Sequence, residues 1–280
     1  MSDTPSYSIN VGGQLLMLDH PLVMGILNAT PDSFYQHHEG EEAIRQHVRR
    51  MIAEGADLID VGACSTRPGF VPATEEEEMR RLREALAIVR QEAPEAIVSV
   101  DTFRASVARA CINEFGVQIV NDISGGDLDK EMFPTVAELG VPYILTHNKP
   151  IPTEDETEVM AQYLRDLGER VERLHEMGAA DVILDPGFGF GKTLRQNYII
   201  MQNLEVTHEL HLPLLIGVSH KSMIWKLLGT TPLGAMNGTT VLHTVALQKG
   251  SHILRVHEVK EATECIKIWQ ALQDCRLPHQ

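Results

Sequence analysis

Short runs of apolar residues recur along the chain, and each is followed by a longer amphipathic segment. The runs are rich in Val, Ile and Leu and nearly continuous, which is typical of strands buried on both faces of a parallel sheet. Eight such runs are present: Leu22–Asn28, Asp57–Gly62, Ile97–Asp101, Gln118–Asp122, Tyr143–His147, Val182–Asp185, Leu214–Ser219 and Ile253–His257. They predict eight parallel strands.

The segments between these runs carry helical spacing. Glu41–Glu54 has apolar residues at helical intervals, Thr74 precedes a run of glutamates as a helix cap would, and Glu156–Met177 predicts a long helix. Strands that alternate with helices predict a parallel α/β fold. Eight strands are the number that closes a (β/α)8 TIM barrel. An open doubly wound sheet is the alternative that the same alternation permits.

A different pattern precedes the first run. Ser8–Asp19 has Gly12 and Gly13 at its centre, which resembles a β-hairpin with a tight turn, and we expect it to cover the bottom of the barrel. A barrel of this class needs roughly 250 residues. The 280 residues therefore fit a single domain over 1–280, with the hairpin at about 8–19 and the barrel at about 22–273.

Polar residues fall at the ends of the apolar runs. They are Asn28, Asp60, Asp101, Asn121, Asp122, His147, Asp185, Ser219, Arg255 and His257. In a closed barrel the carboxyl ends of all strands share one rim, so we expect these residues to converge on one mouth. Carboxylates and amides pair with a polar heterocycle, while Arg and Lys hold phosphate. These residue types therefore favour a ligand in which a polar ring carries an anionic leaving group.

The net charge limits the expected binding partners, and the cysteine content indicates the cellular compartment. The chain has 24 Lys and Arg against 39 Asp and Glu, a formal net charge of −15, which argues against nucleic acid or an anionic membrane as the main partner. No apolar run is long enough to span a membrane. The four cysteines show neither metal-ligand spacing nor the density of a disulfide scaffold, so we expect reduced thiols in a cytoplasmic protein.

Seven local motifs carry a resemblance to a known family. They read MGILNATPDSF (24–34), DLIDVGACSTRPG (57–69), VDT (100–102), VNDISGG (120–126), LDPGFGFGKT (184–193), GVSHKS (217–222) and LRVH (254–257). In this order and at these intervals they resemble the motifs of dihydropteroate synthases, and the match covers almost the whole chain.

The resemblance implies roles position by position. Asp101, Asn121, Asp185, Lys221 and Arg255 match the pterin pocket of the family, and the catalytic residues implied are Asp101, Lys221, Arg255 and His257. Thr66, Arg67, Pro68 and Ser222 match the 4-aminobenzoate site. Asn28 matches the side chain that contacts Mg²⁺, the implied cofactor.

The reaction that the resemblance implies is a substitution. A 6-hydroxymethyl-7,8-dihydropterin pyrophosphate condenses with 4-aminobenzoate to give 7,8-dihydropteroate and pyrophosphate by a dissociative path, as a step of folate biosynthesis. The resemblance further implies a homodimer, and sulfonamides as competitors at the 4-aminobenzoate site.

The sequence departs from the family pattern in three places. Tyr35–Gly40 replaces the usual continuation of the first loop, Ala63 and Cys64 stand where the second loop has Gly-Glu, and His220 stands where the seventh strand has an arginine. The changes bear on loop closure and the second substrate more than on the pterin pocket. Two other functions stay open: a pterin-binding methyltransferase with a corrinoid partner, and a non-catalytic pterin-binding module.

Overall fold

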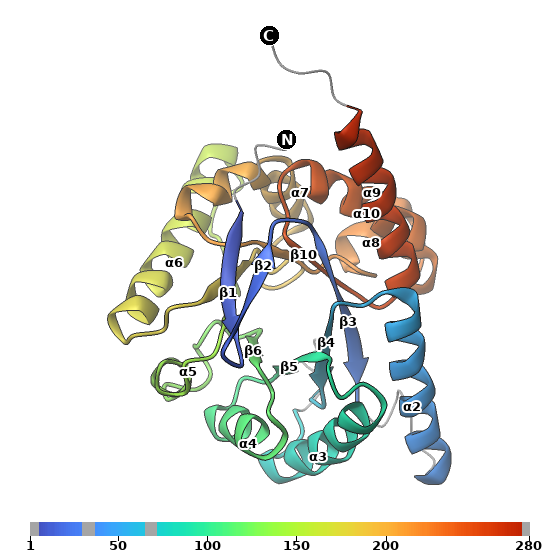
Figure 1. Cartoon of the computed structure of the whole chain (residues 1–280). Coiled ribbons are helices and arrows are strands. Elements are labelled where there is room, and N and C mark those ends of the chain that lie inside the picture. The colour runs from blue at the N-terminus through green and yellow to red at the C-terminus, as the bar shows by residue number, and fades with distance from the viewer. Residues whose placement is uncertain (1–5, 30–36, 65–71, 276–280) are drawn as a thin grey trace.

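Eight parallel strands form the centre of the molecule (Figure 1). The computed structural model describes residues 6–29, 37–64 and 72–275, and for residues 37–39 the backbone alone. The strands are β3 (Leu22–Asn28), β4 (Leu58–Gly62), β5 (Ile97–Asp101), β6 (Ile119–Asp122), β7 (Tyr143–Thr146), β8 (Val182–Asp185), β9 (Leu215–Ile216) and β10 (Ile253–Val256). Their order is β8-β7-β6-β5-β4-β3-β10-β9.

The two outer strands of this order meet and close the barrel. Leu184 of β8 forms a parallel bridge with Leu214, and its N–H donates to the carbonyl of Pro213 at 2.8 Å. The TIM-barrel prediction is therefore confirmed, and the open doubly wound alternative was wrong. The strand predicted over Leu214–Ser219 is only Leu215–Ile216, because the chain already turns at Val218, whose carbonyl accepts from the N–H of Lys221.

Helices surround the strands. They are α2 (His37–Glu54), α3 (Glu75–Glu92), α4 (Ala105–Phe115), α5 (Met132–Leu139), α6 (Glu156–Glu176), α7 (Leu194–Gln202), α8 (Ser222–Leu228), α9 (Met236–Gln248) and α10 (Val259–Asp274), with 3-10 turns η1 (Leu204–Leu210) and η2 (Pro232–Ala235). The predicted cap is confirmed, since the Thr74 hydroxyl accepts from the N–H of Glu77. No helix among these described segments is long and apolar enough to cross a membrane.

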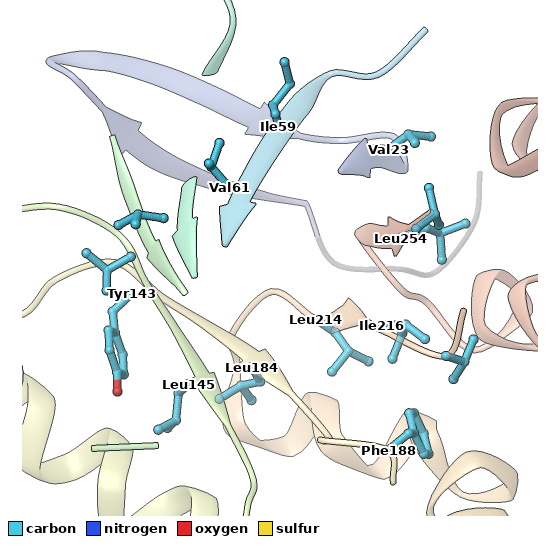
Figure 2. Packing of buried hydrophobic residues seen from close by; sticks show 14 of the residues in the cluster. Val23, Ile59, Val61, Tyr143, Leu145, Leu184, Phe188, Leu214, Ile216 and Leu254 are labelled. Atoms are coloured by element: carbon cyan, nitrogen blue, oxygen red, sulfur yellow. The ribbon is translucent and has the colours of Figure 1, made fainter. Parts of the chain in front are cut away.

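The outward-facing side chains of the strands form the larger core. Successive residues of a strand point to opposite faces, so every second residue packs against the helices. Figure 2 shows part of this layer, in which Ile59 and Val61 project from β4 and Val23 projects from β3. The inward-facing residues at the start of each strand belong to a separate cluster inside the barrel.

The hairpin closes the amino-terminal end of the barrel. Strands β1 (Tyr7–Val11) and β2 (Gln14–Leu18) pair antiparallel through a turn at Gly12 and Gly13, which both have the positive φ that glycine tolerates (Figure 1). Ile9, Val11 and Leu18 are buried in one cluster with the first inward-facing residues of the barrel strands. The predicted covering of the barrel bottom is confirmed.

Leu18 and Leu15 of strand β2 offer a matched test of this plug. Leu18 is 1% exposed in the inner cluster, while Leu15 is 72% exposed. We expect Leu18→Ala to lower the free energy of unfolding by about 2–5 kcal/mol, the range for a buried leucine that leaves a cavity. Leu15→Ala is expected to change it by less than about 0.5 kcal/mol. Urea unfolding of both variants measures the difference, and equal losses would contradict the plug.

Candidate active site

The interior of the barrel changes from apolar to polar between its two ends. The inward-facing residues near the strand starts are Leu58, Ile119, Ile144, Ile183, Leu215 and Ile253. Two residues further along the same strands stand Asp60, Asn121, Thr146, Asp185, Gly217 and Arg255. Because side chains alternate along a strand, this second set also faces inward. The carboxyl half of the barrel interior is therefore a polar mouth above an apolar floor.

Arg255 is the central cation of this mouth. Its Nε donates to Oδ2 of Asp60 at 2.6 Å, and its Nη2 donates to Oδ2 of Asp101 at 2.7 Å. The Arg255 side chain is 16% exposed, Asp60 is fully buried, and Asp101 is 21% exposed. Burial disfavours the charge on Arg255, but the two carboxylates outweigh burial and raise its pKa.

Asn121 joins the same network. Its Nδ2 donates to Oδ2 of Asp60 at 2.9 Å, so one carboxylate oxygen serves both the amide and the guanidinium. This contact leaves the amide oxygen of Asn121 to face other donors. Asp60 thereby fixes the orientation of two side chains that the sequence predicts to contact the pterin.

Asp101 differs from Asp60 because it reaches the opening of the mouth. Burial raises the pKa of Asp101 to about 7 against the opposing charge of Arg255; the nearby Asp60 and Asp122 add to the rise, and Lys221 opposes it. The protonation of Asp101 is thus poised near neutral pH. Perturbed carboxylates of this kind are typical of catalytic sites.

Asp185 and Lys221 form the second charged part of the mouth. Burial raises the pKa of Asp185, and the N–H of Gly187 together with Lys221 opposes that rise. Burial lowers the pKa of Lys221 to about 8, against the opposing effect of Asp185. The Lys221 Nζ lies 4.1 Å from the centre of the Phe190 ring, a cation–π contact that stabilises the ammonium.

The glycine-rich loop after β8 holds Asp185 in place. The Gly187 N–H donates to Oδ1 of Asp185 at 2.8 Å, with Gly187 at a φ of 65°. A Cβ there would lie 2.2 Å from the carbonyl oxygen of His147, so only glycine fits. Lys192 Nζ donates to the carbonyls of His147, Gly187 and Phe190, at 2.7, 3.1 and 3.1 Å, and so ties the loop to β7.

His257 lies at the rim, beyond the end of β10. Its Nδ1 is 2.9 Å from the hydroxyl of Ser219, and its backbone N–H donates to the same hydroxyl at 3.3 Å. Asn28 ends the neighbouring strand β3 and is half-buried, and its side chain has no hydrogen-bond partner among the described residues. Ser222 begins α8 directly after Lys221.

Most of the predicted site residues therefore come together in the described part of the chain. Asp101, Asn121, Asp185, Lys221 and Arg255 share the mouth, with His257 and Asn28 on adjacent strand ends. Thr66, Arg67 and Pro68 lie outside the described residues.

Two strand-end residues do not face the mouth, and the expectation that they would was wrong. Asp122 accepts from the backbone N–H groups of Ser124 and Gly126 and from the hydroxyl of Tyr143. His147 contacts Asp166 of α6 at 3.3 Å. Both residues occupy outward-facing positions of their strands, because Asn121 and Thr146 before them take the inward ones. They stabilise the outer layer instead.

No individual role for Asp60 or Phe190 is predicted from the sequence. Asp60 stood among the strand-end residues, yet it supports both Arg255 and Asn121. A signal was present: a carboxylate with apolar residues on both sides, in a strand buried on both faces, requires a partner inside the protein. Phe190 had no comparable signal, since its contact with Lys221 depends on the course of the loop.

The fold and the site together define a class. The protein is a (β/α)8 barrel whose mouth contains three carboxylates, an amide and two cations, a set that suits a polar ring with an anionic group. Comparison with known proteins names that class, because the family model described as pterin binding enzyme matches residues 24–257.

Individual relatives agree over nearly the full length. Dihydropteroate synthase of Escherichia coli strain K12 is 39% identical over 269 residues, which cover 92% of this chain and 94% of that protein. A structure of the Xanthomonas albilineans dihydropteroate synthase with 4-aminobenzoic acid is 36% identical, has a TM-score of 0.89 and covers 97% of this chain and 100% of that one. A structure of that synthase in complex with 7,8-dihydropteroate has 35% identity, a TM-score of 0.86 and coverage of 96% and 100%.

The chain belongs to the pterin-binding enzyme family and, within it, to the dihydropteroate synthases, which makes it a transferase of folate biosynthesis. The resemblance inferred from the seven motifs is confirmed.

Proposed function

We propose that the protein condenses 6-hydroxymethyl-7,8-dihydropterin pyrophosphate with 4-aminobenzoate. The bond between the pterin methylene carbon and the pyrophosphate oxygen breaks, and the electron pair leaves with pyrophosphate. The aniline nitrogen then forms the new C–N bond and loses a proton. The observation that carries this proposal is the buried mouth in which Asp185, Asn121 and Lys221 lie with the Arg255–Asp101 pair.

The polar groups of the mouth suit a pterin ring. Asp185 offers a buried carboxylate to the ring N–H and exocyclic amino group, and Lys221 compensates its charge. Asn121, held by Asp60, turns its amide oxygen to a further donor of the ring. Arg255 presents a planar guanidinium that stacks on an aromatic face. The floor of Ile and Leu residues below these groups has no polar side chain to compete for the donors and acceptors of the ring.

Asp101 and the rim residues suit the two charges that develop as the bond breaks. An ionised Asp101 stabilises positive charge on the methylene carbon and pterin ring. Arg255 and His257 stabilise the pyrophosphate as it takes up negative charge. Because Asp101 also contacts Arg255, the carboxylate and the guanidinium are already oriented before the substrate arrives. No covalent enzyme intermediate is needed, since the aniline nitrogen is itself a nucleophile.

Asn28 suits a Mg²⁺ ion that arrives with the substrate. Its amide oxygen is the kind of hard ligand that Mg²⁺ accepts, and the side chain has no competing hydrogen bond among the described residues. One protein ligand fits Mg²⁺, which keeps several waters and binds phosphate oxygens rather than an all-protein cage. When bound, such an ion supplies positive charge to the leaving pyrophosphate.

The second substrate is assigned to the start of α8 and the second loop. Ser222, half-buried at the start of α8, would hold the carboxylate of 4-aminobenzoate, together with Thr66, Arg67 and Pro68 of the second loop. Lys221 precedes Ser222 directly in the chain, so the start of α8 lies next to the residues proposed to hold the pterin. Sulfonamides, as analogues of 4-aminobenzoate, would compete there.

Turnover of purified protein tests the function. With Mg²⁺ and both substrates, we expect pyrophosphate and dihydropteroate to form in equal amounts. Excess EDTA is expected to stop both, and added Mg²⁺ alone to restore both. Full activity in EDTA would refute the role given to the ion and Asn28.

Other outcomes of the same assay separate the alternatives. Pyrophosphate without dihydropteroate would show that the leaving group departs but the second substrate is not captured, which points to Cys64 and the loops. Absence of both products while the pterin still binds would favour the binding module or the methyltransferase over the synthase.

The pH profile tests the charges assigned to Asp101 and Lys221. Below about 7, the raised pKa of Asp101 leaves it neutral; above about 8, the lowered pKa of Lys221 leaves that group neutral. Since kcat/KM reports the free enzyme, we expect it to rise through about pH 7 and fall above about pH 8. Asp101→Asn should lower kcat by about 100- to 1000-fold and lose the acidic limb. A wild-type acidic limb that persists in Asp101→Asn would contradict the assignment.

We also propose a homodimer that buries the face formed by α8, η2, α9 and α10. Helices α8, α9 and α10 lie on one side of the barrel (Figure 1), and η2 contacts α8 and α9. The four elements carry the exposed side chains Leu227, Leu228, Leu233, Val241, Ile268 and Leu272. Apolar side chains concentrated on adjacent surface elements are typical of protein interfaces. Sedimentation velocity should show a dimer that Leu233→Glu and Ile268→Glu weaken, whereas Leu15→Glu on the exposed hairpin should not. A monomeric wild type would refute it.

A cytoplasmic location agrees with the state of the cysteines. Cys64, Cys111, Cys265 and Cys275 are all free thiols, and burial raises the pKa of Cys111 to about 12, which makes that thiol unreactive. Cell fractionation should place the protein with the cytoplasmic enzymes.

A further inference from the structure

Three metal-binding side chains gather at the rim between β9 and β10. They are His220, which follows β9, and His257 and Glu258, which follow β10. One ligand atom from each residue lies within 4.8 Å of the other two, and all three side chains are half-buried. The two histidine rings meet edge to face with centres 5.5 Å apart. The cluster includes His257, which is also proposed to meet the leaving pyrophosphate, but none of the residues that suit the pterin.

The hydrogen bonds of His220 fix which of its nitrogens can bind an ion. Nδ1 faces the carbonyl oxygen of Pro232, and Nε2 lies 2.7 Å from Oε1 of Glu258. A carbonyl oxygen only accepts, so Nδ1 carries the proton. In the neutral ring, Nε2 then keeps a lone pair directed at a carboxylate. Two such acceptors attract each other only through a cation between them, which is either a proton on Nε2 or a metal ion.

Outer partners orient the other two ligands. The Ser219 hydroxyl lies 2.9 Å from Nδ1 of His257 and 3.4 Å from Oε2 of Glu258. The carbonyl oxygen of Pro232 orients the His220 ring through Nδ1. Metal-ligating histidines nearly always have their other ring nitrogen held in this way by a carbonyl, a carboxylate or water.

The backbone also holds His220 in an unusual position. Its φ of 54° lies in the left-handed region, which non-glycine residues seldom adopt, and its N–H donates to the hydroxyl of Thr239 at 3.3 Å. Only one other non-glycine residue of the described chain has a positive φ, the exposed His211. The constrained backbone therefore directs the His220 ring toward Glu258.

We propose that His220, His257 and Glu258 bind a divalent transition-metal ion of the Zn²⁺ type. Two imidazoles and one carboxylate form a ligand set that Zn²⁺ uses with a fourth position open to water or an anion. Bonds of about 2.0–2.1 Å place neighbouring ligand atoms of a tetrahedron roughly 3.4 Å apart. The present atoms need only small side-chain movements, for which the partly exposed Glu258 has room. Mg²⁺ prefers oxygen ligands and would not choose this set.

Titration of the full-length metal-free protein with Co²⁺ tests the site. Imidazole and carboxylate ligands in a low-coordinate site give visible d–d absorption, and a cysteine site would add a near-ultraviolet thiolate band. We expect the d–d spectrum without the thiolate band, and its displacement by Zn²⁺. His220→Gln and Glu258→Gln should each weaken Co²⁺ binding by more than about tenfold, since loss of an outer partner alone costs about 10- to 100-fold.

Two controls make the result specific. His211→Gln removes the other histidine with a positive φ, outside the cluster, and Asn28→Ala removes the ligand assigned to Mg²⁺; both should keep the Co²⁺ spectrum. Thermal unfolding shows whether each variant is folded, and if His220→Gln is not, Glu258→Gln decides the question. Absence of a d–d spectrum in the wild type, its persistence in folded Glu258→Gln, or its loss in Asn28→Ala would overturn the proposal. None of these readouts depends on turnover.

Discussion

The alternation of side chains along short strands is the constraint on which the molecule depends. With four or five residues in most strands, each contributes only two or three inward-facing positions. The first of these is apolar and the next is polar in most strands, so one barrel interior contains both a hydrophobic floor and a charged mouth. Because the floor is only one layer deep, it would meet water at the bottom of the barrel. The hairpin with Ile9, Val11 and Leu18 supplies the missing layer.

The mouth above this floor concentrates charges that a folded protein would otherwise avoid. Buried ion pairs seldom stabilise a protein relative to apolar packing, so Asp60, Asp101 and Arg255 are better explained by function than by stability. Their burial differs in a useful way. Asp60 is fully buried and anchors Arg255 and Asn121, whereas the Asp101 side chain is 21% exposed and can reach a ligand in the mouth. The inner carboxylate thus holds the geometry, and the outer one remains available for chemistry.

The sequence predicted the elements well where a single pattern determines them. Continuous apolar runs located β5 and β8 with their observed bounds, and Thr74 marked the start of α3. The pattern did not predict which face of its strand a single polar residue occupies. Asp122 and His147 follow the same kind of run as Asp185, but they fall on the outward face, which depends on the register of each strand. The pairs Asp60–Arg255 and His220–Glu258 join residues 195 and 38 positions apart, which one sequence without a fold cannot bring together.

His220 shows how a departure from a family pattern can add chemistry rather than remove it. An arginine at this position would be a permanent cation, and a guanidinium has no lone pair for a metal. Imidazole can take either part: protonated, it forms an ion pair with Glu258, and neutral, it offers Nε2 to an ion. The carbonyl of Pro232 makes the second state possible, because it keeps the proton on Nδ1 and leaves Nε2 facing the carboxylate. A proton and a metal ion therefore compete for one position, in a cluster that shares His257 with the proposed pyrophosphate site.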